Sequence, residues 1–274
     1  MENNTALELV PDDVLKEIYL LEEQANRLEM RGRAQEEFMA YVHHVYDGFI
    51  EGTHHRIIAE KLERIANGEL KRLIVNMPPR HSKSEFASYL MPSWFLGRNP
   101  KLKIIQATMN TELAVRFGRK VRDLIADPVY KEVFPDTELK QDSQAAGRWE
   151  TNAGGEYFAA GVGAAMTGRG ADLLIIDDPH SEQDALSSTA YDNAYEWYTS
   201  GPRQRLQPGG SIIIVQTRWS KKDITGRLLS AMGKDVMSDQ WEVVEFPAIM
   251  PSGEPLWPEF WEKDELLKVK ASLS

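Results

Sequence analysis

The stretch NMPPRHSKSEF, residues 76–86, decides how this sequence folds. It follows a short apolar, β-branched run that is typical of a buried parallel strand, and it runs into KSEFASYLMPSWFLG, which is typical of a helix. A strand, a tight turn with inward-facing N–H groups and a helix N-terminus together bind anions. The pattern GxxxxGK[ST] would place glycine where this sequence has Met77 and Ser82. Taken alone, the stretch is equally compatible with a phosphate-binding loop and with an ordinary helix start carrying a solvated lysine.

The composition is that of a globular chain. Its 274 residues, 42% hydrophobic and 27% charged, predict one large α/β domain, alone or with a helical arm. The absence of cysteine excludes disulfides, thiolate metal sites and cysteine nucleophiles. No apolar run approaches the ~20 residues of a membrane span, and the N-terminus has no signal-peptide character. We therefore expect a soluble intracellular protein.

The net charge of −10 argues at first against a nucleic-acid partner, but its distribution weakens that argument. Residues 1–70 hold 15 acidic and 7 basic side chains, whereas residues 71–274 hold 27 and 25. Basic stretches such as RFGRKVR, residues 116–122, are able to meet phosphates, although solvated helix faces are the simpler explanation. Contact with DNA through local patches therefore stays open.

Apolar periodicity divides the chain into a helical front and an alternating body. Helical spacing predicts helices at about 12–31 and 34–46. The glycine-punctuated segment 147–170 predicts a hairpin followed by a mobile loop. Short apolar runs alternate with helical segments at residues 72–77, 101–109, 171–180, 210–220 and 241–249. This alternation predicts one doubly wound, mostly parallel sheet flanked by helices.

A second motif, LLIIDD at residues 173–178, ends a buried strand in two carboxylates. Because adjacent strand residues point to opposite sides, the pair can divide its work. Asp177 would hold Mg²⁺, directly or through water, and Asp178 would orient and activate the attacking water. A polar strand end that caps the next helix is the alternative.

A third motif, IIIVQTRW at residues 212–219, delivers Gln216 and Thr217 to the same sheet edge, where a γ-phosphate sensor would lie. A polar loop is the alternative. The three motifs in this order favour an ATP-hydrolysing P-loop domain, with Lys83 on the β- and γ-phosphates and the Ser84 hydroxyl on Mg²⁺. The predicted cofactors are ATP and Mg²⁺.

The stretches MPPRHSKSE, GRGADLLIIDDP and VQTRW resemble the ATPase domain of the large terminase subunit of tailed bacteriophages, over residues 54–261. That family's loop often reads proline-proline-arginine-histidine-glycine-lysine-serine, so Ser82 replaces a glycine here. The resemblance implies an α/β fold, a P-loop NTPase of the additional-strand catalytic-glutamate type with an N-terminal helical arm. It divides the chain into the arm at 1–53, the ATPase domain at 54–262, and the start of a linker toward an absent nuclease domain at 263–274.

Two departures from the family pattern matter. The family's second acid is usually glutamate, whereas this chain has Asp178, which is one methylene shorter and predicts a different water position or slower chemistry. The chain also stops where the join to a nuclease domain of the ribonuclease H type would lie. We therefore expect no nuclease activity in it, whether it is an excised motor domain or a naturally split subunit.

The motifs and the resemblance together define the predicted site. Catalysis is assigned to Asp178, Lys83, Arg169 and Arg80, and the metal to Ser84 and Asp177. The predicted nucleotide contacts are Pro79, Arg80, His81, Ser82, Lys83, Ser84, Glu85, Gln216, Thr217 and His55. The resemblance places adenine near Tyr46, His54, His55 and Arg56, where a ring face would stack on it, although core packing explains Tyr46 equally well.

Arginine is suited to spreading charge on a transferring phosphoryl group, and two candidates stand out. Arg169, on a glycine-flanked loop ahead of the Asp177 strand, is favoured as a finger that reaches a neighbouring subunit's ATP. Arg80, inside the phosphate loop, would act in cis or sense the nucleotide, and Arg218 is a weaker third candidate. An ion pair of Arg169 with an acid such as Asp172 is the structural alternative.

The resemblance implies a motor that couples Mg-ATP hydrolysis to translocation of double-stranded DNA into a procapsid. Its implied partners are DNA, the portal protein of the procapsid, the small terminase subunit, and further copies of itself in a ring. We expect the isolated chain to be monomeric, to have no membrane association, and to work in the host cytoplasm, transiently at the portal vertex and not as a stable virion component. The alternatives are another P-loop DNA translocase or helicase, and a non-catalytic nucleotide-switch assembly subunit.

Overall fold

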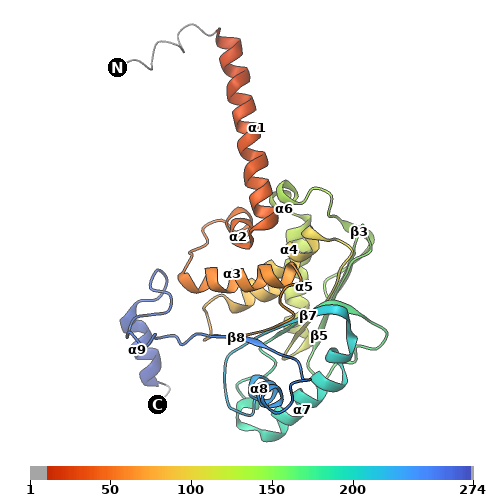
Figure 1. Cartoon of the computed structure of the whole chain (residues 1–274), viewed down its shortest axis with the longest axis vertical. Helices are drawn as coiled ribbons and strands as arrows, with labels where there is room; N and C mark the ends of the chain where they lie inside the picture. Colours follow the sequence, from red (N-terminus) through yellow and green to blue (C-terminus); the bar gives the residue numbers. More distant parts are fainter. Residues whose placement is uncertain (1–10, 273–274) are drawn as a thin grey trace.

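The computed structural model describes residues 11–272, and within them one mixed sheet forms the centre of the molecule (Figure 1). The sheet has eight strands in the order β3-β4-β5-β2-β6-β7-β1-β8. Neighbours from β5 through β8 run parallel, whereas β3, β4 and β5 pair antiparallel at one edge. The strands are β1 (Arg72–Asn76), β2 (Lys103–Thr108), β3 (Leu139–Ala145), β4 (Arg148–Thr151), β5 (Glu156–Gly161), β6 (Ala171–Asp177), β7 (Leu206–Gln216) and β8 (Glu242–Glu245). The predicted mostly parallel sheet is confirmed.

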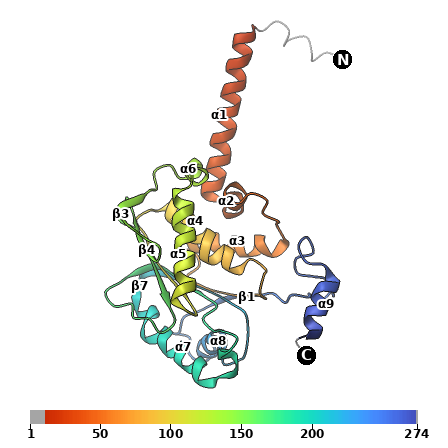
Figure 2. The same cartoon turned by 180° about the vertical axis from the view of Figure 1, so that it is seen from behind.

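Helices cover both faces of this sheet (Figures 1 and 2). The α-helices are α1 (Asp12–Glu36), α2 (Phe38–Val45), α3 (Thr53–Ala66), α4 (Met91–Arg98), α5 (Thr111–Ala126), α6 (Pro128–Val133), α7 (Ser188–Ser200), α8 (Ile224–Lys234) and α9 (Lys263–Ser272). A π-helix, η2 (Glu85–Leu90), precedes α4, and two short 3₁₀ segments, η3 (Asp184–Leu186) and η4 (Pro202–Arg205), flank α7.

The strands read as continuous apolar runs because both of their faces are buried. In β6, Leu173 and Ile175 pack into the core beneath the helices α2 to α6, whereas Leu174 and Ile176 pack into a second core beneath α7 and α8. Successive side chains of a strand point to opposite faces, so a run without polar residues fills both cores. The sheet thus lies between two helical layers, and polar groups lie at its carboxyl edge.

The carboxyl ends of β1, β7 and β6 lie side by side. Asn76, the last residue of β1, pairs in register with Gln216, and Asp177, the last residue of β6, pairs with Val215. Strand β7 therefore lies between the strand that enters the phosphate loop and the strand that ends in the two carboxylates. The three motifs of the sequence meet at one edge because parallel strands deliver their carboxyl ends to the same side.

The front of the chain differs from its prediction in detail. Helix α1 continues to Glu36 and stands away from the body in both views (Figures 1 and 2), and Ala34 is its only buried residue. The last strand was predicted at 241–249, but β8 has only four residues because the chain leaves the sheet edge after Glu245. No helix among the described residues is long and apolar enough to cross a membrane. The domain boundaries at 53/54 and 262/263 stay predictions.

Candidate functional site

The predicted phosphate loop, residues 77–84, connects β1 to η2 and bends through two left-handed residues. Arg80 has a φ of 58° and Ser82 a φ of 70°, a region that favours glycine. Ser82 stands where the common pattern has its second glycine, so the backbone keeps the conformation although the residue has changed. The first glycine position is taken by Met77, whose N–H donates to the carbonyl oxygen of Gln216 at 3.0 Å. The residue that replaces the second glycine therefore has a left-handed, strained backbone.

Lys83 and Asp178 form an ion pair at the mouth of this loop. The Lys83 Nζ lies 2.9 Å from the Asp178 Oδ2, and the lysine is 6% exposed. The other oxygen of Asp178 accepts a hydrogen bond from the backbone N–H of Thr217 at 2.7 Å. Asp178 has a φ of 41°, and such outliers gather at functional sites. The structure therefore joins the predicted phosphate-binding lysine, the predicted water-orienting acid and the predicted sensor segment.

Asp177 is held by two hydroxyls. The Ser84 Oγ donates to its Oδ1 at 2.9 Å and the Ser88 Oγ donates to its Oδ2 at 2.7 Å. Gln106 supports this arrangement because its Nε2 donates to the Ser88 Oγ at 2.8 Å. Burial, followed by the charge of the neighbouring Asp178, raises the pKa of Asp177 above its usual range. A cation beside this buried carboxylate would stabilise its charged form.

The donor chemistry at Ser84 and Asp177 fits Mg²⁺. A hydroxyl and a carboxylate are hard oxygen ligands, and Mg²⁺ usually takes one or two protein ligands and completes its shell with water and phosphate oxygens. Within residues 11–272 no group of three or more His, Cys, Asp or Glu side chains is placed to hold a metal ion by itself. A hydroxyl and carboxylate pair of this kind suits Mg²⁺ whose remaining ligands are water and phosphate oxygens.

Sequence reasoning missed Ser88 and Gln106. Ser88 lies on the π-helix η2, a rare element that is frequent at functional sites, and it is fully buried. Gln106 is also fully buried, in the middle of β2. The available signal was a polar residue inside an apolar run: KIIQAT for the strand, and a second serine four residues after Ser84 for the helix.

Gln216 makes its contacts away from Asp178. Its Nε2 donates to the Thr225 Oγ1 at 2.6 Å, and that hydroxyl donates to the Asn76 Oδ1 at 3.1 Å. Asn76 in turn donates to Glu245 on β8 at 3.2 Å. The polar ends of β7, β1 and β8 and the first turn of α8 therefore form one hydrogen-bonded network, which is buried except at Glu245. Asn76 and Thr225 are further residues that the sequence did not single out.

Arg218 is committed to structural partners. Its Nε donates to the Asp223 Oδ2 at 2.9 Å, and its Nη1 lies 3.4 Å from Glu245. Asp223 is fully buried and also caps α8 by accepting from the Gly226 N–H. The third arginine candidate therefore anchors the segment after β7 to α8.

The two favoured arginines lie at different ends of the sheet. Arg80 is exposed on the phosphate loop, and its carbonyl accepts from the Trp261 Nε1 at 3.4 Å. Arg169 precedes β6 and forms an ion pair with Glu156, while its guanidinium lies 3.9 Å from the ring centre of Phe158. Because Arg169 precedes the amino end of β6, it lies about 20 Å along the strand from the carboxyl edge of the sheet. Asp172, the partner considered from the sequence, accepts instead from the Lys103 N–H.

Histidines and tryptophans pack beneath the phosphate loop. His54 and His55 are buried with ring centres 3.8 Å apart, and His55 also stacks on Phe86 at 5.0 Å. Burial lowers the pKa of His54 to about 4 and that of His55 to about 3, and it also lowers the pKa of His81. The structure thus places His55, expected near adenine, inside the core against Phe86 and Trp257.

The remaining predicted nucleotide contacts follow the loop. Pro79 is exposed, and its carbonyl oxygen lies 2.8 Å from the Nδ1 of buried His81. Glu85 begins η2 and pairs through both oxygens with Lys120 at 3.0 Å. Pro79 is therefore exposed to solvent, whereas His81 stacks on Trp261 and Glu85 pairs with Lys120 of α5.

Comparisons with known proteins identify this fold. No family model and no curated protein matches the sequence. Among solved structures, the HK97 bacteriophage large terminase superposes with a TM-score of 0.50 at 12% identity, over 82% of this chain and 48% of that chain. A mutant of the large terminase ATPase domain of Thermus phage P74-26 aligns at 15% identity with a TM-score of 0.46, over 73% of this chain and 82% of that chain. The chain therefore shares the fold of bacteriophage large terminases, as the sequence motifs predicted, and spans about half the length of the HK97 protein.

Proposed function

We propose that this chain is the ATP-hydrolysing motor domain of a viral DNA-packaging terminase. The observation that carries the proposal is the convergence of Lys83, Ser84, Asp177 and Asp178 at the carboxyl edge of the sheet, where Lys83 pairs with Asp178 and Ser84 donates to Asp177. The fold shared with the HK97 large terminase supports the same function. These residue types in this arrangement are those that position phosphates, a metal and a water molecule for phosphoryl transfer.

Each residue would have a defined role in hydrolysis. The loop N–H groups and Lys83 would hold the phosphates, and Ser84 and Asp177 would hold Mg²⁺, which neutralises charge on the transferred phosphoryl group. Asp178 would accept a hydrogen bond from the attacking water and orient it in line with the leaving group. Thr217, whose N–H already bonds Asp178, would keep that carboxylate in position.

The ion pair between Lys83 and Asp178 adds a control step. A phosphate group that binds Lys83 would compete with Asp178 for the ammonium group. The freed carboxylate then becomes available to the water. We propose that the acid is engaged by the lysine until phosphate replaces it, so that the catalytic arrangement forms only on substrate binding.

The position of β7 supports assignment to the additional-strand type of P-loop NTPase. Strand β7 lies between β1, which enters the phosphate loop, and β6, which carries the acids. Asp178 occupies the place of that type's usual glutamate, with a side chain one methylene shorter. The strained backbone at Asp178, with its φ of 41°, would set the reach of this shorter acid.

We assign the trans finger to Arg169. Its place at the amino end of β6, about 20 Å from the carboxyl edge, supports a role on a neighbouring copy and not on its own nucleotide. To act, Arg169 must leave Glu156 and the ring of Phe158. Arg80, exposed on the loop, is the alternative and would act in cis.

The partners follow from this function and are proposals with it. They are double-stranded DNA, the portal of a procapsid, a small terminase subunit, and further copies of this chain in a ring at the portal vertex, in the host cytoplasm. Arg116 and Arg119 support contact with DNA phosphates, because they are exposed on α5 and line a cavity of about 560 Å³ beside the end of β2. Nuclease activity is not proposed for this chain.

The test is phosphate release from Mg-ATP by assembled rings and by dilute chain, for the wild type, Arg169→Ala and Arg80→Ala. We expect Arg169→Ala to abolish the stimulation that assembly produces and to leave the slow turnover of dilute chain unchanged. Full-rate turnover by dilute chain, unaffected by Arg169→Ala, would contradict the trans finger. Unwinding of a duplex without procapsid would favour a helicase, and phosphate release unchanged by Asp178→Asn would favour a nucleotide switch.

A further inference from the structure

Helix α1 carries an apolar seam that the described body of the protein leaves uncovered. Its members are Val14, Ile18, Leu21, Ala25 and Leu28, at spacings of four, three, four and three residues. This alternation places all five on one stripe, the pattern of a coiled-coil seam. Leu21 and Leu28 are 58% and 66% exposed. An exposed apolar stripe of this kind is typical of a helix face that packs against a partner.

The charges of α1 favour one particular occupant. Its outer half, residues 12–24, holds five acidic side chains and one lysine, whereas its inner half, residues 25–36, holds three arginines and two glutamates. Two copies aligned in parallel would place the two acidic halves side by side. Two antiparallel copies would place each acidic half against the arginine-bearing half of the other.

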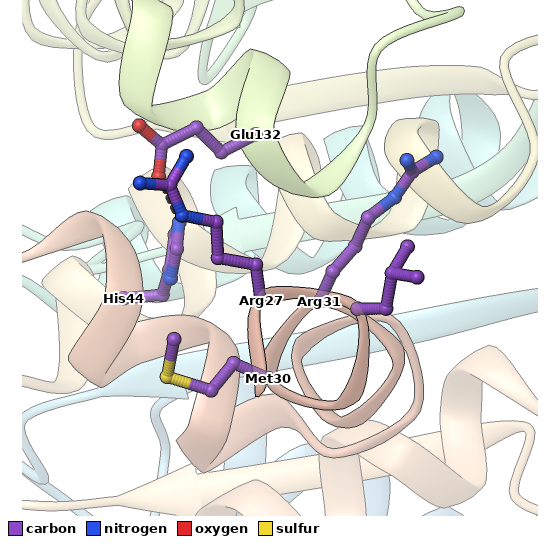
Figure 3. Close-up of a pocket in the computed structure, with 6 residues that line it drawn as sticks. Arg27, Met30, Arg31, His44 and Glu132 are labelled. Atoms are coloured by element: carbon purple, nitrogen blue, oxygen red, sulfur yellow. Dashed lines mark ion pairs between the residues drawn. The ribbon is translucent and has the colours of Figure 1, made fainter. Parts of the chain in front are cut away.

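A cavity at the base of α1 fits the same arrangement. It measures about 500 Å³ and is lined by Arg27, Leu28, Met30, Arg31, His44 and Glu132. Figure 3 shows Arg27 and Arg31 leaving α1 on the side of α6, with Arg27 beside Glu132 and His44. Glu132 is paired with His44 at 3.1 Å, and Arg27 with Glu23 at 2.5 Å. An acidic helix end lying along this base would meet two guanidinium groups.

We propose that α1 pairs with α1 of a second copy of this chain as an antiparallel coiled coil. Residue 23 of each copy lies opposite residue 23 of the other, so Leu21 packs against the partner's Ala25, and Ile18 against the partner's Leu28. Glu17 then lies beside the partner's Arg31, and the outer end with Asp12 and Asp13 reaches the basic cavity. This pairing replaces the expectation of a monomeric isolated chain, and it does not depend on nucleotide hydrolysis.

The first test is the oligomeric state of the full chain by sedimentation velocity. Leu21→Asp is compared with Leu20→Asp, a matched control because Leu20 is 57% exposed and lies off the seam. We expect the wild type and Leu20→Asp to dimerise and Leu21→Asp to remain monomeric, with equal helix content by circular dichroism. A wild type that is monomeric at its highest soluble concentration overturns the proposal, as does equal loss of the dimer in both variants.

The second test is the direction of pairing. Glu17→Arg and Arg31→Glu should each weaken dimerisation by about tenfold, and the double variant should restore it. Because the chain has no cysteine, single substitutions to cysteine report contacts between copies only. Leu21→Cys mixed with Ala25→Cys should cross-link on oxidation, whereas neither should cross-link with itself. Self-linking of Ala25→Cys, or no rescue by the double variant, would overturn the antiparallel pairing.

Discussion

The Lys83 Nζ lies 2.9 Å from the Asp178 Oδ2. The lysine proposed to bind phosphate and the acid proposed to orient water therefore neutralise each other's charge in this structure. The lysine is buried, and a buried ammonium without a partner would be strongly destabilising. The carboxylate therefore has a structural task, to satisfy Lys83, in addition to the catalytic one that we propose.

Asp178→Asn should separate binding from hydrolysis. The amide keeps the shape of the side chain but loses the charge that competes with phosphate for Lys83, so Mg-ATP affinity should be equal to or higher than that of the wild type. Phosphate release should fall by about 100-fold or more, because the amide cannot accept the proton of water. Fluorescent-nucleotide titration and a phosphate-release assay measure the two effects. Asp178→Glu is the matched control and should keep turnover.

Ser82→Gly should stabilise the protein. At a φ of 70° glycine relieves strain, and part of this gain is offset by the greater freedom of glycine in the unfolded chain. The free energy of unfolding, measured by urea denaturation, should rise by about 0.5–1 kcal/mol. Ser84→Gly should instead lower it, because Ser84 has a helical φ of −73° and donates to Asp177. A loss of stability in Ser82→Gly would show that the serine side chain has a task of its own.

Ser84→Ala and Ser88→Ala should differ although both serines donate to Asp177. Removing the Ser84 hydroxyl takes away a proposed metal ligand, so the Mg²⁺ concentration for half-maximal phosphate release should rise by about tenfold. Removing the fully buried Ser88 hydroxyl leaves the Gln106 amide without its acceptor, which should cost about 1–3 kcal/mol of unfolding free energy with little change in Mg²⁺ demand. The same response from both variants would contradict the assignment of the metal to Ser84.

His54→Leu should make the free energy of unfolding less dependent on pH in the acid range. The pKa of His54 is about 4 in the folded chain against an ordinary value of about 6.5, so between these limits the unfolded chain binds a proton that the folded chain refuses. The free energy of unfolding therefore falls as pH drops from about 6.5 toward 4, by up to about 1.4 kcal/mol per pH unit for this group.

Urea denaturation from pH 7.5 to 4.5 measures this slope in the wild type and in His54→Leu. His55, with a pKa of about 3, and Asp177, with its raised pKa, titrate in both proteins, so the difference between the two curves isolates His54. Identical slopes would mean that the pKa of His54 is the same in the folded and the unfolded chain.

The sheet and the centre of the site were predictable from sequence because local signals agreed there. Apolar runs with both faces buried identified β1, β6 and β7, and polar residues at the ends of those runs identified Asp177 and Asp178. Parallel pairing then required that these ends meet. The sequence showed that Ser82 replaces a glycine, whereas its left-handed conformation is a finding of the structure.

The rest depended on contacts between distant segments, which a single sequence does not encode locally. Ser88 meets Asp177 across 89 residues, and Thr225 meets Asn76 across 149. The partner of Arg169 is Glu156, on the strand next but one to β6, and not the nearby Asp172. His55 is a polar residue in the first turn of α3, and it is buried against aromatic residues as remote as Trp257.

The hydrogen bond from Trp261 to the carbonyl of Arg80 bears on how this protein should be labelled for experiment. Trp261 also stacks on His81 at 6.0 Å, and α9 begins two residues later. A dye attached to α9 is therefore tethered through a short segment to the predicted phosphate loop, and its emission should follow nucleotide occupancy. A fusion partner in the same place would pull on that loop, so tags that must leave the kinetics undisturbed belong at the other terminus.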